Sequence, residues 1–170
     1  MTKEQEILAE ISASAPRRLI AIICLYGLGA LLIYIAFAQP PAFGWQLFLL
    51  ALGGGSLWMG DALRRATATT LQITETELRE ANGEVVAYVA DIKSVDRGFF
   101  AFKPSNGFLI RTTQAAGPKR WRPGLWWRLG QQIGIGGVAP GRQTKFASEV
   151  LSIMVAKREN PDQFDLGDPS

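Results

Sequence analysis

The sequence predicts a membrane-anchored α+β protein, in which a two-helix transmembrane hairpin precedes a small antiparallel β sheet or open barrel closed by a C-terminal helix. Two long uncharged runs near the N-terminus indicate the hairpin. From residue 69 the apolar residues alternate with polar ones, as in half-buried strands, and residues 140–157 return to helical spacing. We therefore expect an N-terminal tail over residues 1–18, a hairpin over 19–65, a β domain over 66–158 and a disordered acidic tail over 159–170.

The first uncharged run covers residues 19–38, LIAIICLYGLGALLIYIAFA. As a helix it would be about 30 Å long, the thickness of a bilayer core. Ahead of it, Ile7, Leu8 and Ile11 have helical spacing and predict a short amphipathic helix on the surface, or a frayed end. The triplet Ala36-Phe37-Ala38 also fits a signal-peptidase site. However, the run is longer than the usual apolar part of a signal peptide, so we favour a membrane span.

The second run begins at Trp45, which we expect to anchor the chain at the membrane interface. It continues uncharged to Gly60, about 24 Å of helix, and extends to Leu63 if Asp61 finds a partner in the arginines that follow. A re-entrant segment is the alternative to a full span.

Basic residues flank the two runs on their outer sides only. Arg17 and Arg18 precede the first run, Arg64 and Arg65 end the second, and the connecting loop has no Lys or Arg. The positive-inside rule therefore predicts a multi-pass membrane protein with both termini in the cytoplasm.

Small residues on the two runs predict close helix packing. The residues concerned are Gly27, Gly29, Gly53, Gly54 and Gly55. We expect them to bring the two helices of one chain together; the alternative is a docking face for another membrane protein.

Short strands separated by turns predict the β domain. Leu71 and Ile73 alternate with polar residues, Asn82-Gly83 is a hairpin turn, and residues 85–89 are rich in β-formers. We expect further strands around Phe99, Phe100 and Phe102, over residues 108–112, and as one strand over 126–135. Pro140 and Gly141 open the last helix, which carries Phe146, Val150, Ile153 and Met154 on one stripe.

Two local stretches add a family resemblance. Residues 88–95, YVADIKSV, and residues 132–137, QIGIGG, resemble strands of the bacterial PH-like domain proteins of the membrane. The resemblance covers residues 69–158 and implies a binding or scaffolding module without catalytic residues or a cofactor. The basic, Trp-rich stretch near residues 114–128 departs from the simple family pattern.

Composition excludes several kinds of catalytic site. The chain has no histidine and a single cysteine, Cys24, inside the first apolar run. A Ser-His-Asp triad, a Cys-His dyad and the standard zinc sites are therefore ruled out. We expect no enzyme activity, no metal and no cofactor.

The most distinctive stretch is residues 119–128, KRWRPGLWWR, with four cations, three tryptophans and no acid. It lies within residues 97–148, which hold nine Lys or Arg and no carboxylate. Such a loop beside a bilayer predicts a contact with anionic lipid or with a membrane partner. The structural alternative places one tryptophan in the core and leaves the cations solvated. We expect no nucleic-acid binding, because the chain is tethered to a membrane and has no RNA-binding motif.

These observations predict a non-catalytic inner-membrane accessory, scaffold or assembly protein that docks on a larger membrane complex. The alternative is a tethered PH-like module that reads anionic headgroups through the Trp-rich stretch. The predicted contact residues are Arg17, Arg18, Trp45, Arg64, Arg65, Lys119, Arg120, Trp121, Arg122, Trp126, Trp127 and Arg128.

Overall fold

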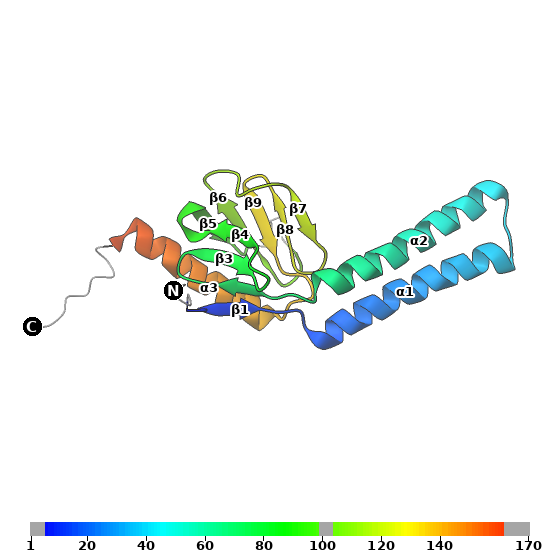
Figure 1. The fold of residues 1–170 in the computed structure, drawn as a ribbon, viewed down its shortest axis with the longest axis horizontal. Coiled ribbons are helices and arrows are strands. Elements are labelled where there is room, and N and C mark those ends of the chain that lie inside the picture. Colours follow the sequence, from blue (N-terminus) through cyan, green and yellow to red (C-terminus); the bar gives the residue numbers. More distant parts are fainter. Residues whose placement is uncertain (1–5, 99–103, 162–170) are drawn as a thin grey trace, which may run out of the picture.

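A computed structural model describes residues 6–98 and 104–161. Two antiparallel sheets and a C-terminal helix form a domain, from which a pair of long helices projects (Figure 1). The helices are α1 (Ala15–Ala38), α2 (Phe43–Ala66) and α3 (Gly141–Glu159), with a short 3-10 turn η1 (Val89–Asp91). The strands are β1 (Ala9–Ile11), β2 (Leu71–Ile73), β3 (Glu77–Glu80), β4 (Val85–Tyr88), β5 (Ile92–Asp96), β6 (Phe108–Thr112), β7 (Arg120–Arg122), β8 (Trp126–Leu129) and β9 (Gln132–Ile135).

Within the described residues, one helix is long and apolar enough to cross a membrane. This helix is α1, which begins at Ala15 rather than at Leu19. By this measure the expectation of two spans is met for α1 alone, because α2 has the same length but a less apolar composition. Gln46, the glycine triplet 53–55 and Ser56 interrupt its apolar run.

The two long helices lie side by side and contact each other through two of the five predicted glycines. A Cβ added at Gly29 would lie 2.7 Å from Leu57 and 2.9 Å from the Gly53 carbonyl oxygen. The prediction is wrong for Gly27, Gly54 and Gly55, where an added Cβ meets nothing within 4 Å. Helical periodicity explains the difference, since adjacent residues point to different sides of a helix.

The N-terminal segment is part of the domain, which corrects the predicted tail. Residues 9–11 form strand β1 and pair antiparallel with β2, with Ile11 opposite Leu71. Ile11 is completely buried in the core, so this segment forms neither an amphipathic helix nor a frayed end there. The α1–α2 hairpin is therefore inserted between two neighbouring strands of one sheet.

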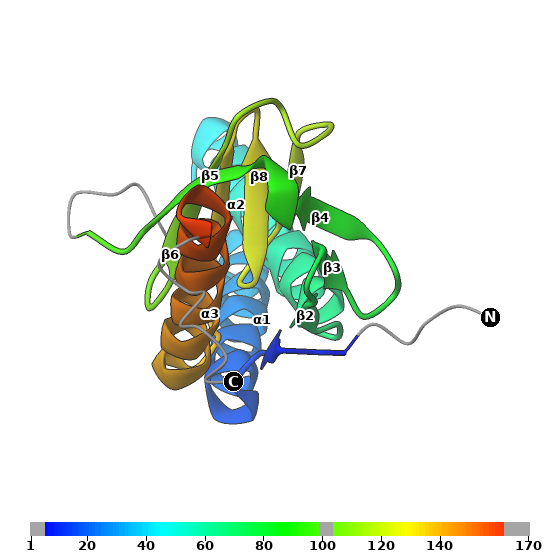
Figure 2. The ribbon, with the colours of Figure 1, turned by 90° about the vertical axis from the view of Figure 1, so that its left-hand side faces the viewer.

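The two sheets have the strand orders β1-β2-β3-β4 and β5-β6-β9-β8-β7. Their inner faces enclose a core that includes Leu71, Leu78, Phe108, Trp126 and Ile133. Helix α3 covers one open side, where it contacts β1 and β5, and β4 and β7 lie on the other side (Figure 2). Among the strands of residues 6–98 and 104–161, no hydrogen-bonded ladder joins the two sheets into a closed barrel.

Two strand predictions differ from the structure. Residues 126–135 form two strands, β8 and β9, because the chain turns at Gly130, whose φ of +61° suits glycine. The predicted strand at Phe99, Phe100 and Phe102 lies outside the described residues.

The domain is fixed to the base of the helical hairpin at several points. The Ser14 amide donates to the Val138 carbonyl (2.9 Å), and Arg17 Nη1 donates to the Ala139 carbonyl (3.3 Å). Gly124, in the turn between β7 and β8, packs so closely on Leu63 that an added Cβ would lie 2.5 Å from its Cδ1. The β7–β8 hairpin consequently sits next to the end of α2.

Candidate functional site

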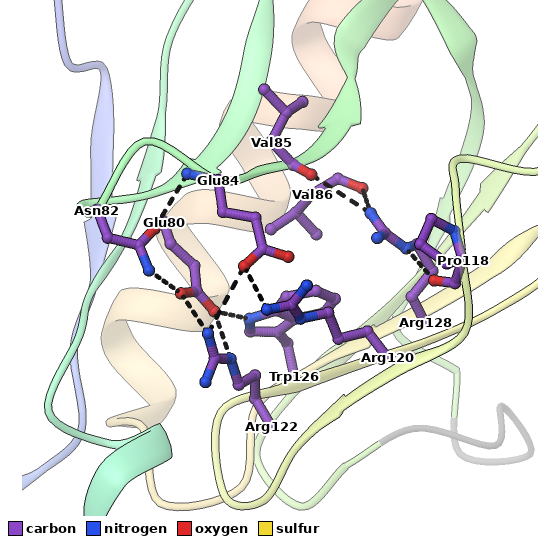
Figure 3. Close-up of polar contacts among 10 residues, drawn as sticks. All are labelled: Glu80, Asn82, Glu84, Val85, Val86, Pro118, Arg120, Arg122, Trp126 and Arg128. Carbon is purple, nitrogen blue, oxygen red and sulfur yellow. Dashed lines mark hydrogen bonds and ion pairs between the residues drawn. The ribbon is translucent and has the colours of Figure 1, made fainter.

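Side chains close the side of the domain opposite α3, where the edges of the two sheets meet (Figure 3). Glu80, at the end of β3, is a completely buried carboxylate. It accepts hydrogen bonds from Trp126 Nε1 (2.7 Å), from Arg122 Nε (3.1 Å) and Nη2 (3.3 Å), and from Asn82 Nδ2 (2.9 Å). Four donors leave this carboxylate engaged on both oxygens, so its role is to join the sheets rather than to move protons.

Glu84 extends this network toward solvent. Its Oε2 lies 3.0 Å from Arg120 Nη2 and 3.6 Å from Arg122 Nη2. One carboxylate from β3 and one from the turn between β3 and β4 therefore face two arginines from β7 (Figure 3). The sequence predicted these cations in a solvated or lipid-facing loop, but Arg120 and Arg122 form ion pairs with carboxylates of the same domain.

Arg128 also joins the two sheets along the seam, the line where their edges meet, but through backbone carbonyls rather than carboxylates. Its Nη1 donates to the carbonyls of Val85 (3.3 Å) and Val86 (2.9 Å) on β4, the edge strand of the first sheet, and its Nε donates to the Pro118 carbonyl (3.0 Å). The guanidinium also lies 5.5 Å from the centre of the Trp126 ring. Burial lowers the pKa of Arg128 from its ordinary value, an effect that the Glu84 charge opposes. Arg128 thus satisfies carbonyls that a neighbouring strand would otherwise pair.

The outward face of the β7–β8 hairpin has a different character. Trp121 and Trp127 are cross-strand partners, and Trp127 is paired in turn with Gly134 on β9. The Trp127 indole occupies the space that a side chain at position 134 would need. Trp121 and Leu129 are 54% and 52% exposed. Two large apolar side chains are therefore exposed on one face of a short hairpin.

A shallow groove of about 630 Å³ runs over this face. Its lining consists of Trp121, Trp127 and Leu129, with Lys119 and Arg120 at the rim. We call these five residues the Trp groove. Its walls are mainly apolar, and two cations lie at the edge.

The structure separates the residues that the sequence grouped as contacts. Trp126, Arg122 and Arg128 belong to the core or to the seam between the sheets, whereas Lys119, Trp121 and Trp127 line the Trp groove. The placement of one tryptophan in the core fits the structural alternative for this stretch.

The remaining predicted contact residues lie on the helical hairpin. Arg17, Arg18, Arg64 and Arg65 lie at the domain end, and Trp45 is exposed near the opposite end. Asp61 pairs with Arg64 (2.8 Å) and Arg65 (2.7 Å), as the spacing indicated.

Sequence reasoning missed Glu80 and Leu129. The signal for Glu80 was its place two residues after Leu78, because alternate residues of a strand share a face and Leu78 points into the core. Leu129 gave no comparable signal, since the region was predicted as one continuous strand. Among the described residues, no group of three or more His, Cys, Asp or Glu side chains is placed to hold a metal ion.

Comparisons of the chain with protein-family models, curated proteins and solved structures find no match.

Proposed function

We propose that this chain is a non-catalytic, membrane-anchored docking protein of the bacterial inner membrane, whose PH-like domain presents the Trp groove to a membrane protein partner. The observation that carries the proposal is the exposed apolar surface of Trp121 and Leu129, which lies with Lys119 on the β7–β8 hairpin, whose turn packs on the end of α2. Large apolar groups with a cationic rim are typical of protein interfaces.

In the proposed arrangement both long helices enter the membrane, with both termini of the chain in the cytoplasm. Support comes from the side-by-side packing of α2 on α1, which shields part of the less apolar helix from lipid. The four arginines at the domain end of the hairpin, and the uncharged loop at the other end, agree with the positive-inside rule.

The attachment of the domain supports a scaffolding role. β1 precedes the hairpin, β2 follows it, and the turn between β7 and β8 packs on the end of α2. Because the chain enters and leaves the hairpin through paired strands, the Trp groove has a fixed orientation relative to α1 and α2. A fixed surface binds with little loss of conformational entropy.

A protein partner is favoured over recognition of anionic lipid headgroups. Each unpaired cation near an anionic bilayer contributes about 1 kcal/mol. Of the four cations in residues 119–128, Arg120 and Arg122 pair with carboxylates and Arg128 is buried against backbone carbonyls. The electrostatic attraction to lipid is therefore much smaller than the sequence indicates, whereas the apolar groove is unaffected.

Native mass spectrometry of the full chain, extracted from its own membrane in a mild detergent, tests the proposal. We expect a stoichiometric complex with another membrane protein. A matched preparation of Phe146→Ser, which removes a 55% exposed aromatic from α3, should retain the same complex. A monomer that carries only lipid would contradict the proposed function.

A further inference from the structure

We propose that the Trp groove binds an acidic segment of the partner protein that carries at least one large apolar side chain and lies at the cytoplasmic surface of the membrane. This inference rests on the proposed docking function and specifies the chemistry of the partner.

The apolar requirement follows from the floor and walls of the groove. Trp121 and Trp127 face outward side by side on adjacent strands, and Leu129 lies two residues further along β8 on the same face. Trp127 lies over Gly134, so the indole is backed by the sheet and is held in place. A large aliphatic or aromatic side chain fits a surface of this kind, because rigid indoles lose little entropy on contact.

The acidic requirement follows from the charges around the groove. Lys119 and Arg120 stand at its rim. Across the same sheet face, Leu129 is opposite Gln132, and Gln132 is opposite the exposed Arg111 on β6. Although Glu84 partly balances Arg120, Lys119 and Arg111 have no ion pair among the described residues. This face of the sheet is therefore positive at Lys119, just before β7, and at Arg111 on β6. An acidic partner complements this charge.

Asp96 and Glu80 do not reverse this charge. Asp96 lies on β5 at the far end of the row that contains Trp121, Trp127, Gly134 and Leu109. Its Oδ1 accepts a hydrogen bond from the Gly98 amide (2.7 Å), which ties the carboxylate to its own loop. Glu80 is buried on the inner side of the sheet.

A random 12-residue peptide library, displayed on phage and selected against the full chain in neutral-lipid nanodiscs, tests the inference. We expect the selected pool to be enriched in Asp and Glu together with Phe, Trp or Leu. The best peptide should bind the Trp121→Ser and Lys119→Glu variants at least tenfold more weakly, and its affinity should fall as salt is added. Phe146→Ser is the matched control and should bind as the wild type does.

Two variants keep the test independent of folding. Trp121 is exposed, and Lys119→Glu retains every apolar wall of the groove while it reverses one charge. The inference would be overturned by a selected pool without enrichment in Asp and Glu, or by a pool whose enrichment is no greater than that selected on empty nanodiscs. Equal binding of the best peptide to the wild type and to both variants would also overturn it.

Lipid as the occupant gives a different result. The test uses nanodiscs that contain brominated anionic lipid, which quenches tryptophan on contact. The difference in fluorescence between the wild type and Trp121→Phe is the component that belongs to Trp121. Strong quenching of that component would place the bilayer in the groove and overturn the inference. Its absence supports a peptide occupant.

The failures of the two proposals can be separated. If native mass spectrometry retains the same membrane partner for the wild type and for Lys119→Glu, and the library shows no acidic selection, the docking function stands and the acidic segment is wrong. If no partner is retained, the docking function itself is wrong.

Discussion

Glu80 illustrates how one buried charge joins the two sheets of this domain. It receives donors from Trp126 and Arg122 of the second sheet and from Asn82 of its own turn. Such a carboxylate stabilises the fold only while its partners remain, because removal of one member leaves the others unpaired and poorly solvated. The Glu80 network therefore links the core to the β7–β8 hairpin that carries the Trp groove.

We predict that Glu80→Ala lowers the free energy of unfolding by about 3 kcal/mol, the lower end of the range for breaking a buried pair, because Arg122 retains some contact with water. Glu80→Gln keeps the shape and one acceptor, and should cost about 1–3 kcal/mol. Urea unfolding of the full chain in detergent, followed by near-ultraviolet circular dichroism, measures both. Glu75→Ala, at an exposed position nearby, should change stability by less than about 0.5 kcal/mol. Equal stability of Glu80→Ala and Glu75→Ala would refute this role.

At the residue scale, local pattern predicted the kinds of residue but not their partners. The cluster of cations and tryptophans in residues 119–128 was evident, yet Trp126 and Arg122 turn inward while Trp121 turns outward. Their carboxylate partner lies more than forty positions earlier in the chain. Which residues meet depends on how two sheets pack, and alternation along one strand carries no information about that packing.

Two glycines mark a close approach of α1 and α2. Gly29 and Gly53 face each other, and a Cβ at either position would press on the opposite backbone or on a neighbouring side chain. In lipid, where the hydrophobic effect adds little between helices, such contacts account for much of the helix association.

We predict that Gly29→Ala lowers the thermal midpoint of the full chain in detergent, because the added methyl group meets Leu57 at 2.7 Å and the Gly53 carbonyl at 2.9 Å. The expected loss in the free energy of unfolding is about 1–3 kcal/mol, as for overpacked cores. Gly27→Ala is the matched control, since its Cβ meets nothing within 4 Å and alanine favours the helix. A lower midpoint for Gly27→Ala than for Gly29→Ala would show that the helices pack through another face.

At the scale of elements, length and hydropathy predicted α1 and the position of α3, whereas β1 was missed. The predicted apolar stripe of α3 is wrong, because Phe146 and Ile153 are exposed and Ala147 and Leu151 are buried instead. Ile7, Leu8 and Ile11 fit a helical spacing as well as Ala9 and Ile11 fit a strand. The choice is made by β2, about sixty residues later, whose edge accepts the N-terminal segment as a partner. A strand of three residues has too little pattern to be distinguished without its neighbour.

For the molecule as a whole, the order of β1, hairpin and β2 decides which part can fold alone. Ile11 is opposite Leu71 in the sheet, so the chain leaves for the hairpin and returns at the same place. The helices occupy the position of an ordinary β-hairpin turn. A fragment that begins after α2 lacks β1, and with it the completely buried Ile11 and the contact between β1 and α3.

We predict that the domain folds without its helices once β1 is restored. In the variant, residues 6–13 are joined through Asn-Gly to residues 69–161, because a two-residue type I′ turn suits adjacent antiparallel strands. This chain should be soluble and unfold in one cooperative urea transition, whereas residues 69–161 alone should be less stable by about 2–5 kcal/mol, the cost of an absent large core side chain, or remain unfolded. Urea titration with amide-proton dispersion in NMR distinguishes the two. Ile11→Ser in the joined chain is the control and should lose most of the stability that β1 adds. Equal stability of all three chains would show that β1 is dispensable and that residues 66–158 form the folding unit.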